Sequence, residues 1–287
     1  MATRILVLLV VFVLSSGCVA TVRGEGAVDL EQTVCGLKEP FVFWLWSNMA
    51  GRPNSDRVSG LRHVDDIAFE TRDGRILRGY RMNATDRAGQ LVVARGYLLI
   101  IQGNAILADQ IIGEFTELAM NGMDVYVYDF RGYGRSAGRR RLRAIVNDYS
   151  EIIDALNARG YGQRYVYAMS FGGIALLDGD ATLDSLTRLV IDSTPARLSD
   201  YGCPPEYDPV SHLPDDCRHC LFITGEQDRV VSLSMSQELV DEAEQRGASV
   251  IHDAAFAHPF MDRQRSVHRR RMRLIHDYLL ESRLPEK

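Results

Sequence analysis

Ser170, Asp228 and His258 stand in this order along the chain, and each lies just beyond a short run of β-forming residues. A serine hydroxyl is a poor nucleophile until a histidine takes its proton. That histidine in turn needs a carboxylate, which fixes its tautomer and stabilises its charged form. The residue types and their order therefore predict a site for nucleophilic catalysis, provided that the fold brings the three side chains together.

The residues around Ser170 are typical of a sharp turn between a strand and a helix. A β-type run ends at this serine, and Gly172 and Gly173 follow where a helix begins. A nucleophile elbow strains the serine backbone, so the residues two positions on either side of it must be small. Ala168 and Gly172 occupy these positions, where the usual pattern has glycine at both. The motif alone is weak, because small-Ser-small strings recur by chance.

Strands and helices alternate through the chain. Residues 64–71 and 76–81 are separated by Asp73-Gly74, which predicts a hairpin. The alternation beyond it predicts an α/β fold, in which a mostly parallel, doubly wound sheet is covered on both faces and carries the antiparallel hairpin at one edge. The other predicted strands are 97–101, 124–130, 163–168, 189–192, 221–224 and 249–252, and the predicted helices are 108–121, 144–159, 171–179, 233–246 and 262–280.

In such a sheet, chemistry belongs beyond the carboxyl ends of the strands. Four motifs lie there or at the elbow, and with them the chain resembles the α/β-hydrolase fold family, in its small single-domain serine-hydrolase form. The resemblance covers about residues 64–280. The motifs, in the order that the family shows, are 129–136, 168–172, 225–231 and 257–259.

The resemblance implies a role for each member of the triad. Ser170 is the nucleophile, Asp228 the acid and His258 the general base. Asp192 is an alternative acid because it also ends a strand, and His252 is an alternative base that lies within a strand. The implied chemistry requires no cofactor and no metal.

An oxyanion hole requires two backbone N–H groups that point at the developing charge. The resemblance implies Phe171, which follows the nucleophile, and Asn104, which follows Gly103 in the loop after residue 101. Many relatives have His-Gly-Asn in this loop, whereas this chain has Gln102 at the first position. A backbone donor survives that change, although Gln102 and Ala168 together leave open whether catalysis is weakened.

Length and composition indicate one large globular domain. The chain has 287 residues, 46% of them hydrophobic and 25% charged, and a net charge of −5. This charge argues against nucleic-acid binding, which needs a clustered basic surface. The arginine runs at 139–143 and 269–273 are interpreted as solvated helix faces, with binding of an anionic substrate or surface as the alternative. The sequence indicates no oligomeric state.

The first residues are those of an export signal. A ten-residue apolar run, 5–14, is too short to span a bilayer and is followed by small residues up to Cys18. These residues resemble a bacterial lipobox, with Ser15 in place of the usual leucine. They predict a signal peptide over 1–17, acylation of Cys18, and a membrane anchor in the cell envelope or periplasm. Cleavage after Ala20 is the alternative. Residues 18–62 then form an N-terminal segment that partly packs on the domain, 63–287.

Export places the remaining cysteines in an oxidising compartment. Cys35, Cys203, Cys217 and Cys220 form an even set, which predicts one or two disulfides. Pairing of Cys203 with Cys217 or Cys220 would close a short loop, but the sequence does not determine the pairing. Cys217 to Cys220 also has the spacing of half a zinc knuckle, and no second pair accompanies it, so no metal site is expected.

The substrate is less well indicated. Residues 193–220 stand where relatives of this fold insert a cap, but here they are short and rich in proline, which predicts a loop or minimal lid. An open cleft favours small or extended acyl substrates. The aromatic run 41–46 has three open roles: it packs on the domain, walls an acyl pocket, or contacts the membrane beside a lipid anchor.

The sequence thus predicts a cell-envelope serine hydrolase that cleaves an ester-like acyl bond of a small substrate. A serine peptidase with the same triad is one alternative. A non-catalytic envelope lipoprotein that binds a partner through this scaffold is the other. Nothing in the sequence selects among ester, thioester and amide.

Overall fold

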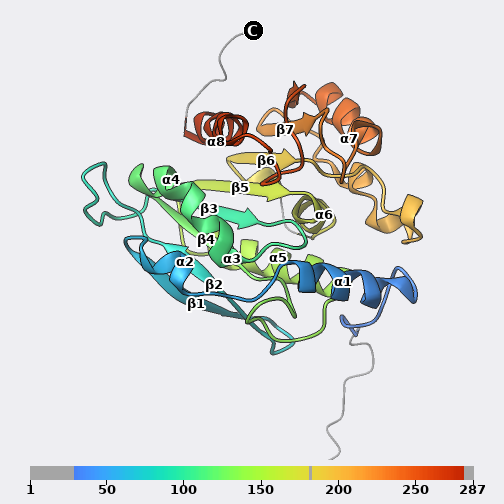
Figure 1. Cartoon of the computed structure of the whole chain (residues 1–287), viewed down its shortest axis with the longest axis horizontal. Coiled ribbons are helices and arrows are strands. Elements are labelled where there is room, and N and C mark those ends of the chain that lie inside the picture. Colours follow the sequence, from blue (N-terminus) through green and yellow to red (C-terminus); the bar gives the residue numbers. More distant parts are fainter. Residues whose placement is uncertain (1–28, 181–182, 281–287) are drawn as a thin grey trace, which may run out of the picture.

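A single β-sheet runs through the part of the chain that the computed structural model describes, residues 29–180 and 183–280 (Figure 1). Its strands are β1 (Val64–Glu70), β2 (Ile76–Met82), β3 (Gly96–Ile101), β4 (Met123–Tyr128), β5 (Gln163–Met169), β6 (Arg188–Asp192), β7 (Cys220–Gly225) and β8 (Ser249–Asp253). They lie in the order β1-β2-β4-β3-β5-β6-β7-β8. β2 pairs antiparallel with β1 and β4, and all other neighbours are parallel. The predicted sheet is therefore confirmed.

Helices cover both faces of this sheet (Figure 1). They are α1 (Lys38–Met49), α2 (Asp56–Ser59), α3 (Ala108–Ile111), α4 (Thr116–Met120), α5 (Leu142–Asn157), α6 (Phe171–Leu177), α7 (Leu233–Gln245) and α8 (Arg265–Leu280). Side chains of β3 alternate between the two resulting cores. Tyr97 and Leu99 pack with residues of α1, α5, α6 and α7, whereas Leu98 and Ile100 pack with residues of α3, α4 and α8. None of the helices in the described ranges has the length and apolar character needed to cross a membrane.

Two predicted helices differ from the structure. The helix expected over 108–121 is divided into α3, a 3₁₀ turn (Ile112–Phe115) and α4. Gly113 lies in the break, and the Thr116 hydroxyl donates to the Gly113 carbonyl at 2.8 Å, a local bond that competes with the regular helix. α8 begins at Arg265 instead of 262, because the Asp262 carboxylate is engaged with the preceding loop, where it accepts the Ala257 N–H at 2.8 Å.

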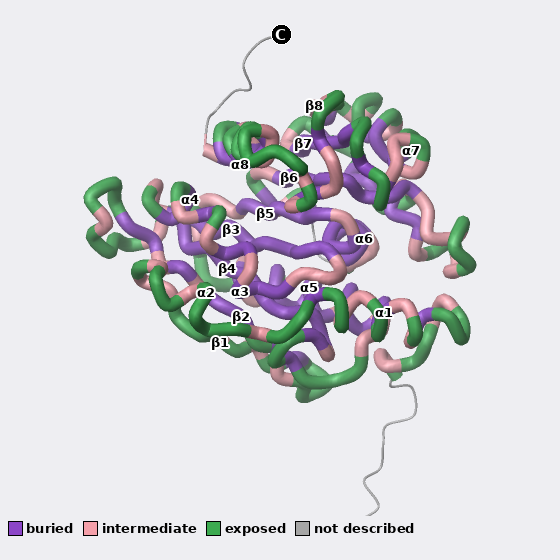
Figure 2. Tube along the Cα trace, in the orientation of Figure 1, coloured by how far each residue is buried: buried purple, intermediate pink, exposed green. Residues whose placement is uncertain are grey.

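Helix α1 was not predicted as a helix. It contains the aromatic run 41–46, which is apolar nearly all round, so it lacks the contrast between a polar and an apolar face that marks a helix in a sequence. In the structure Phe43 is buried against the domain, whereas Phe41 and Trp44 are exposed. The tube in Figure 2 shows this mixture of buried and exposed positions along α1.

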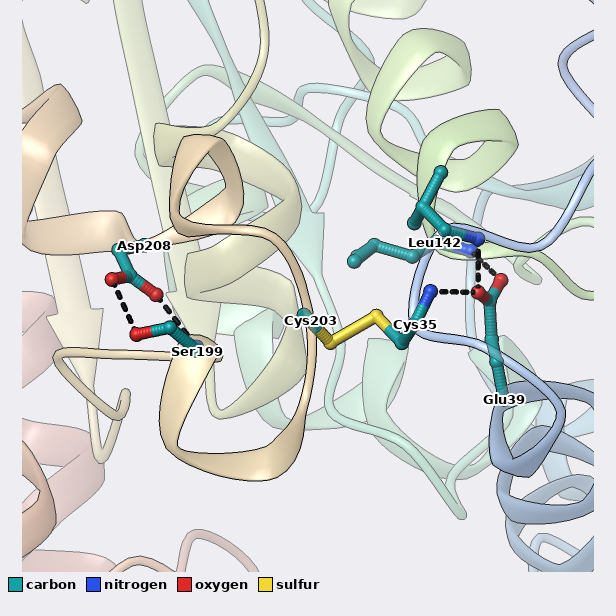
Figure 3. The surroundings of a disulfide bond; sticks show 7 residues. Cys35, Glu39, Leu142, Ser199, Cys203 and Asp208 are labelled. Carbon is teal, nitrogen blue, oxygen red and sulfur yellow. Dashed lines mark hydrogen bonds between the residues drawn. A yellow bond between two sulfur atoms is a disulfide. The ribbon is translucent and has the colours of Figure 1, made fainter.

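A disulfide between Cys35 and Cys203 joins the segment before α1 to the loop between β6 and β7 (Figure 3). The buried Glu39 carboxylate fixes the same segment. It accepts the N–H groups of Val34, Cys35 and Leu142 at 2.7, 2.8 and 3.0 Å, and so ties α1 to the start of α5. The N-terminal helix is thus attached to the domain by the disulfide to the β6–β7 loop and by the hydrogen bond between Glu39 and the start of α5.

The loop between β6 and β7 contains three 3₁₀ turns, Ser199–Tyr201, Pro205–Tyr207 and Pro209–His212, and its residues, all of them described, form no α-helix. The buried Asp208 carboxylate holds it together, since it accepts the N–H and the hydroxyl of Ser199 at 2.8 and 2.7 Å (Figure 3). This segment is a short, tied loop, in agreement with the minimal lid predicted from its prolines.

The short-loop pairing of Cys203 with Cys217 or Cys220 does not form. Cys217 and Cys220 are free thiols, both buried. Cys220 is the first residue of β7, and the N–H of Cys217 donates to the Arg246 carbonyl at the end of α7. Cys217 is thus bound to the end of α7 and Cys220 is fixed in the sheet, while Cys203 is bonded to Cys35.

Loss of the disulfide should destabilise the protein. The bond joins residues 168 apart in sequence, so it strongly restricts the unfolded chain, and its removal should cost about 2–5 kcal/mol. Cys203→Ser should therefore melt at a lower temperature than the wild type, and a reductant should lower the melting temperature of the wild type only. Equal melting temperatures in the absence of reductant would contradict the bridge, and a further fall of the variant on reduction would contradict free thiols at Cys217 and Cys220.

Candidate active site

Ser170 lies at the turn between β5 and α6 with a strained backbone. Its φ of 53° and ψ of −120° fall outside the regions that residues with a side chain normally adopt. The Ser170 N–H donates to the Asp192 carbonyl at 2.8 Å. The Ser170 carbonyl accepts from the Gly173 N–H at 3.0 Å and from the Thr194 hydroxyl at 3.2 Å. This strained strand-turn-helix geometry is that of a nucleophile elbow.

The two glycines after Ser170 are required by close contacts. A Cβ on Gly172 would lie 2.0 Å from the Ile101 carbonyl oxygen, and one on Gly173 would lie 1.9 Å from the Thr194 hydroxyl. On the other side of the elbow, Ala168 is fully buried in β5 with its methyl group inside the core. The alanine therefore departs from the usual glycine without a steric conflict.

His258 contacts Asp228 at the ends of β8 and β7. Its Nδ1 lies 2.8 Å from the Asp228 Oδ2. A carboxylate only accepts, so this contact assigns the proton to Nδ1 and leaves Nε2 as the proton acceptor of the neutral imidazole. The Asp228 Oδ1 accepts the N–H groups of Val230 and Val231, both at 2.8 Å.

The surroundings of Asp228 keep it ionised. Burial raises the pKa of its carboxyl, but the hydrogen bond and charge of His258, together with the N–H groups of Val231 and Val230, outweigh this effect and hold the pKa below its usual value. At neutral pH the aspartate can therefore orient the imidazole and stabilise its charged form.

Asp192, the alternative acid, has other partners. It is buried at the end of β6, where it accepts from the Tyr167 hydroxyl at 3.1 Å and the Ser193 hydroxyl at 3.2 Å. The hydrogen bond of His258 goes to Asp228. The geometry therefore favours Asp228 as the histidine's partner.

His252, the alternative base, is occupied within the sheet, since its Nδ1 lies 2.9 Å from the Thr224 hydroxyl. Ser170 and His258 both lie at the carboxyl edge of the sheet, yet among the described residues no hydrogen bond joins them. In proteins without bound substrate, contacts between nucleophile and base are often long and tighten only in the complex. The structure thus joins Asp228 and His258 by a hydrogen bond, whereas the bond between His258 and Ser170 would have to form when substrate binds.

The predicted oxyanion donors flank Ser170. Phe171 is the first residue of α6, so its N–H has no partner within the helix. The loop after β3 passes close by, because a Cβ on Gly103 would lie 3.3 Å from the Ser170 Cβ. The next residue in this loop, Asn104, accepts from the Tyr133 hydroxyl at 2.7 Å through its side-chain oxygen. That bond holds the segment carrying the second predicted donor.

The Gln102 side chain makes its contacts in the core. It is fully buried, and its amide donates to the Tyr128 carbonyl at 2.7 Å. The Tyr149 hydroxyl donates to the same carbonyl at 2.8 Å. The glutamine thus anchors the loop to the core beneath it, which agrees with a change that leaves the backbone donor in place.

The aromatic run in α1 reaches the candidate site through one residue. The Phe43 ring packs edge to face on Phe171, with 5.2 Å between centroids, and Phe130 packs on Phe171 from another side at 5.4 Å. Of the roles left open for residues 41–46, packing on the domain is therefore the one that Phe43 performs. It covers the residue that follows the candidate nucleophile.

A buried charged group, which was not predicted from the sequence, lies next to the loop that carries His258. Arg271, in α8, donates to the Ala257 carbonyl, and the Asp262 carboxylate accepts the Ala257 N–H at 2.8 Å. The guanidinium also lies over the Phe256 ring, 4.4 Å from its centroid. Arg271 and Asp262 thus bind the backbone of Ala257, the residue immediately before His258, and are positioning residues for His258.

This group corrects the interpretation of the arginine run at 269–273 as a solvated face. Arg271 is 1% exposed and lies 3.8 Å from the carboxylates of Asp192 and Asp262, both fully buried. Counting charges along the chain could not reveal it, but the helical spacing of Arg271 with the buried Ile275 and Tyr278 could have.

Asp262→Ala should lower kcat by about 10- to 100-fold with little change in KM, because the loop that carries His258 loses its clamp while the substrate contacts remain. Steady-state kinetics on an acyl ester, with circular dichroism to verify folding, measures this. Arg269→Gln, an exposed neighbour in the same run, is the control and should retain full activity. Unchanged kcat in a folded Asp262→Ala protein would exclude the positioning role.

A cavity of about 450 Å³ is lined by His258 itself, together with Arg229, Met261, Arg263 and other residues. Its lining does not include Ser170, so we do not assign the acyl group to it. In the described ranges, no group of three or more His, Cys, Asp or Glu side chains is arranged to hold a metal ion.

Comparisons with known proteins agree with this fold. Residues 93–204 match the protein family described as serine aminopeptidase, S33. The uncharacterized protein YfhR of Escherichia coli (strain K12) is 24% identical over 245 residues, which cover 78% of this chain and 83% of that protein.

Two solved structures are similar throughout their length. One is XC6422 from Xanthomonas campestris, an α/β serine hydrolase without a lid, at 18% identity and a TM-score of 0.57, covering 77% of this chain and 98% of that one. The other is Thermogutta terrifontis esterase 2 phosphoramylated by tabun, at 15% identity and a TM-score of 0.60, covering 79% and 98%. These structural similarities show that the chain has an α/β-hydrolase fold. The family match over residues 93–204 agrees with a serine hydrolase.

Proposed function

We propose that this protein cleaves an ester-like acyl bond with Ser170 as nucleophile, His258 as general base and Asp228 as the acid. The observation that carries the proposal is the strained Ser170 turn at the same sheet edge as the hydrogen-bonded Asp228–His258 pair. A backbone conformation of this cost persists where function requires it.

In the proposed mechanism, the Ser170 oxygen attacks the acyl carbon while the His258 Nε2 takes the hydroxyl proton. The N–H groups of Phe171 and Asn104 stabilise the oxyanion that forms. His258 then gives its proton to the leaving group, which departs and leaves an acyl group on Ser170. Water, activated by the same imidazole, hydrolyses this intermediate and restores the serine.

The tied loop between β6 and β7 supports a small or extended acyl substrate, because the described residues of this loop form no helical cap. An esterase and a lidless hydrolase among the similar structures favour an ester. The family description, serine aminopeptidase, supports a peptidase as the second candidate. Both candidates use the same residues, so they differ only in the bond that is cleaved.

We also propose that the protein is exported and held at a membrane by acyl chains on Cys18. The signal-like residues 1–17 and Cys18 lie outside the described residues, so this proposal depends on their sequence. The Cys35–Cys203 disulfide supports an oxidising compartment such as the cell envelope.

A fluorophosphonate probe should label the wild type covalently, and Ser170→Ala should abolish both the label and ester cleavage, with a loss of at least about 10⁴-fold in kcat. Labelling detected by mass spectrometry should fall on the peptide that contains Ser170. Ser193→Ala is the matched control: Ser193 directly follows the neighbouring strand β6 and has a similar φ of 54°, and its replacement should leave the label in place.

A folded wild type that takes no label and cleaves no short acyl ester would refute the enzymatic proposal and favour a binding lipoprotein. Paired assays on a p-nitrophenyl acyl ester and an aminoacyl p-nitroanilide distinguish the remaining candidates. Faster turnover of the anilide would replace the esterase by the peptidase.

Replacement of Cys18 should remove the lipid anchor. The variant is Cys18→Ser, exported behind a leader that an ordinary signal peptidase removes, so that no uncleaved signal retains it. We expect the wild type in the detergent phase and most of the variant in the aqueous phase. Equal detergent partitioning of the two proteins would contradict lipidation at Cys18.

A further inference from the structure

Helix α1 presents a stripe of large apolar side chains to solvent. Leu37, Phe41, Trp44, Leu45 and Met49 are 97, 63, 52, 42 and 66% exposed. Their spacing of four, three, one and four residues places them on one side of the helix, one turn above another. We call these five residues the α1 stripe.

The stripe belongs to a firmly attached helix. On the opposite side of α1, Phe43 is buried and packs on Phe171, and the buried Glu39 carboxylate binds three backbone N–H groups. The Cys35–Cys203 bond holds the segment that leads into the helix. Because α1 is fixed to the domain in this way, its outward side chains cannot turn inward to be buried in the core.

The charges around the stripe favour an anionic surface. Lys38 at one end of α1 and Arg52 just beyond the other are both exposed, and neither makes an ion pair with another described residue. The only acidic residue within α1 is Glu39, which points into the domain. A helix that shows Trp, Phe and Leu on one side with cations at its ends has the composition of a segment that lies in a membrane interface.

The position of the stripe in the chain identifies which membrane. Cys18, the proposed acylation site, precedes Leu37 by only 19 residues. A tether of this length reaches at most about 65 Å when fully extended, so it keeps α1 close to the bilayer and makes its binding effectively intramolecular. A second copy of the chain would instead meet the stripe only by diffusion.

We propose that the α1 stripe docks on the surface of the bilayer that carries the Cys18 anchor, with the helix parallel to the membrane plane. This inference depends on the proposed lipidation for its tether, but not on the proposed hydrolysis. Docking sets the orientation of the domain, because Phe43 on the inner side of the same helix covers the residue next to Ser170. The candidate site then lies beside the membrane, close to acyl groups in its outer layer.

Tryptophan fluorescence reports on this docking directly, because both tryptophans of the chain, Trp44 and Trp46, lie in α1. Trp44 belongs to the stripe, whereas Trp46 is half-buried with its ring near Phe43. The protein to use is residues 18–287 with Cys18→Ser, so that no acyl chain contributes to binding. The probe is a vesicle of phosphatidylglycerol and phosphatidylcholine whose acyl chains are brominated near the head groups.

In the Trp46→Phe variant, which retains Trp44, the brominated vesicles should quench fluorescence at least about twofold more than unbrominated ones. In the Trp44→Phe variant, which retains Trp46, the two vesicles should differ little. Equal fluorescence with both vesicles in the Trp46→Phe protein, or stronger quenching of Trp46 than of Trp44, would overturn the proposal.

A second measurement uses the strength of vesicle binding. Phe41→Ser combined with Leu45→Ser should weaken co-sedimentation with the vesicles by at least about tenfold, because two large side chains lose their apolar burial. Val93→Ser is the matched control, since Val93 is 95% exposed but lies before β3, outside the stripe. Its binding should equal that of the parent protein.

The outcomes also separate this proposal from the others. Probe labelling of Ser170 is measured without vesicles, so a labelled protein that does not bind vesicles refutes docking alone. A dimer in sedimentation velocity that is lost on Phe41→Ser and Leu45→Ser would assign the stripe to a second copy of the chain and overturn the bilayer. Transfer of Cys18→Ser from the detergent phase to the aqueous phase tests the tether independently, because docking of α1 requires no acyl chain.

Discussion

The strained turn at Ser170 is the constraint on which the rest of the candidate site depends. A side-chain-bearing residue held in such a conformation costs about 1–3 kcal/mol, which the surrounding contacts must offset. They do so because β5 lies between β3 and β6. From β6 the Asp192 carbonyl accepts the Ser170 N–H, and from β3 the Ile101 carbonyl comes so close that position 172 admits only glycine. The central place of β5 in the sheet therefore produces both the strain and the means to hold it.

Two buried carboxylates near the sheet edge show how burial and charge divide the remaining roles. The pKa of Asp228 is lowered, since His258 and two N–H groups overcome its desolvation, whereas burial raises the pKa of Asp192 although Arg271 lies 3.8 Å away. Environments that push the pKa values of two acids apart commonly separate their functions. Asp228 is suited to stabilise a charged imidazole, and Asp192 to join the elbow to the buried Arg271 behind the histidine loop.

The sequence predicted the parts of this architecture that depend on local patterns. Alternating strands and helices indicated the sheet, and the small residues around Ser170 indicated the elbow, because both are determined within a few residues. The pairing of Cys35 with Cys203 depends on contacts between distant segments, which no spacing reveals. Helix α1 was missed because it is apolar on both sides, one facing the core and the other solvent. The buried Arg271 was misread because the other arginines of the run, Arg269, Arg270 and Arg273, are exposed.

The disulfide pairing, helix α1 and the buried Arg271 were not predicted for a shared reason. Each depends on the N-terminal segment or on α8 packing against the domain from outside the sheet, where local sequence patterns are least informative. The disulfide joins the segment before α1 to the β6–β7 loop, and the buried Phe43 ring of α1 packs on Phe171, the first residue of α6. Because α1 is joined to the domain in this way, a bilayer that binds the apolar outer side of α1 would orient the whole domain, and Ser170 with it.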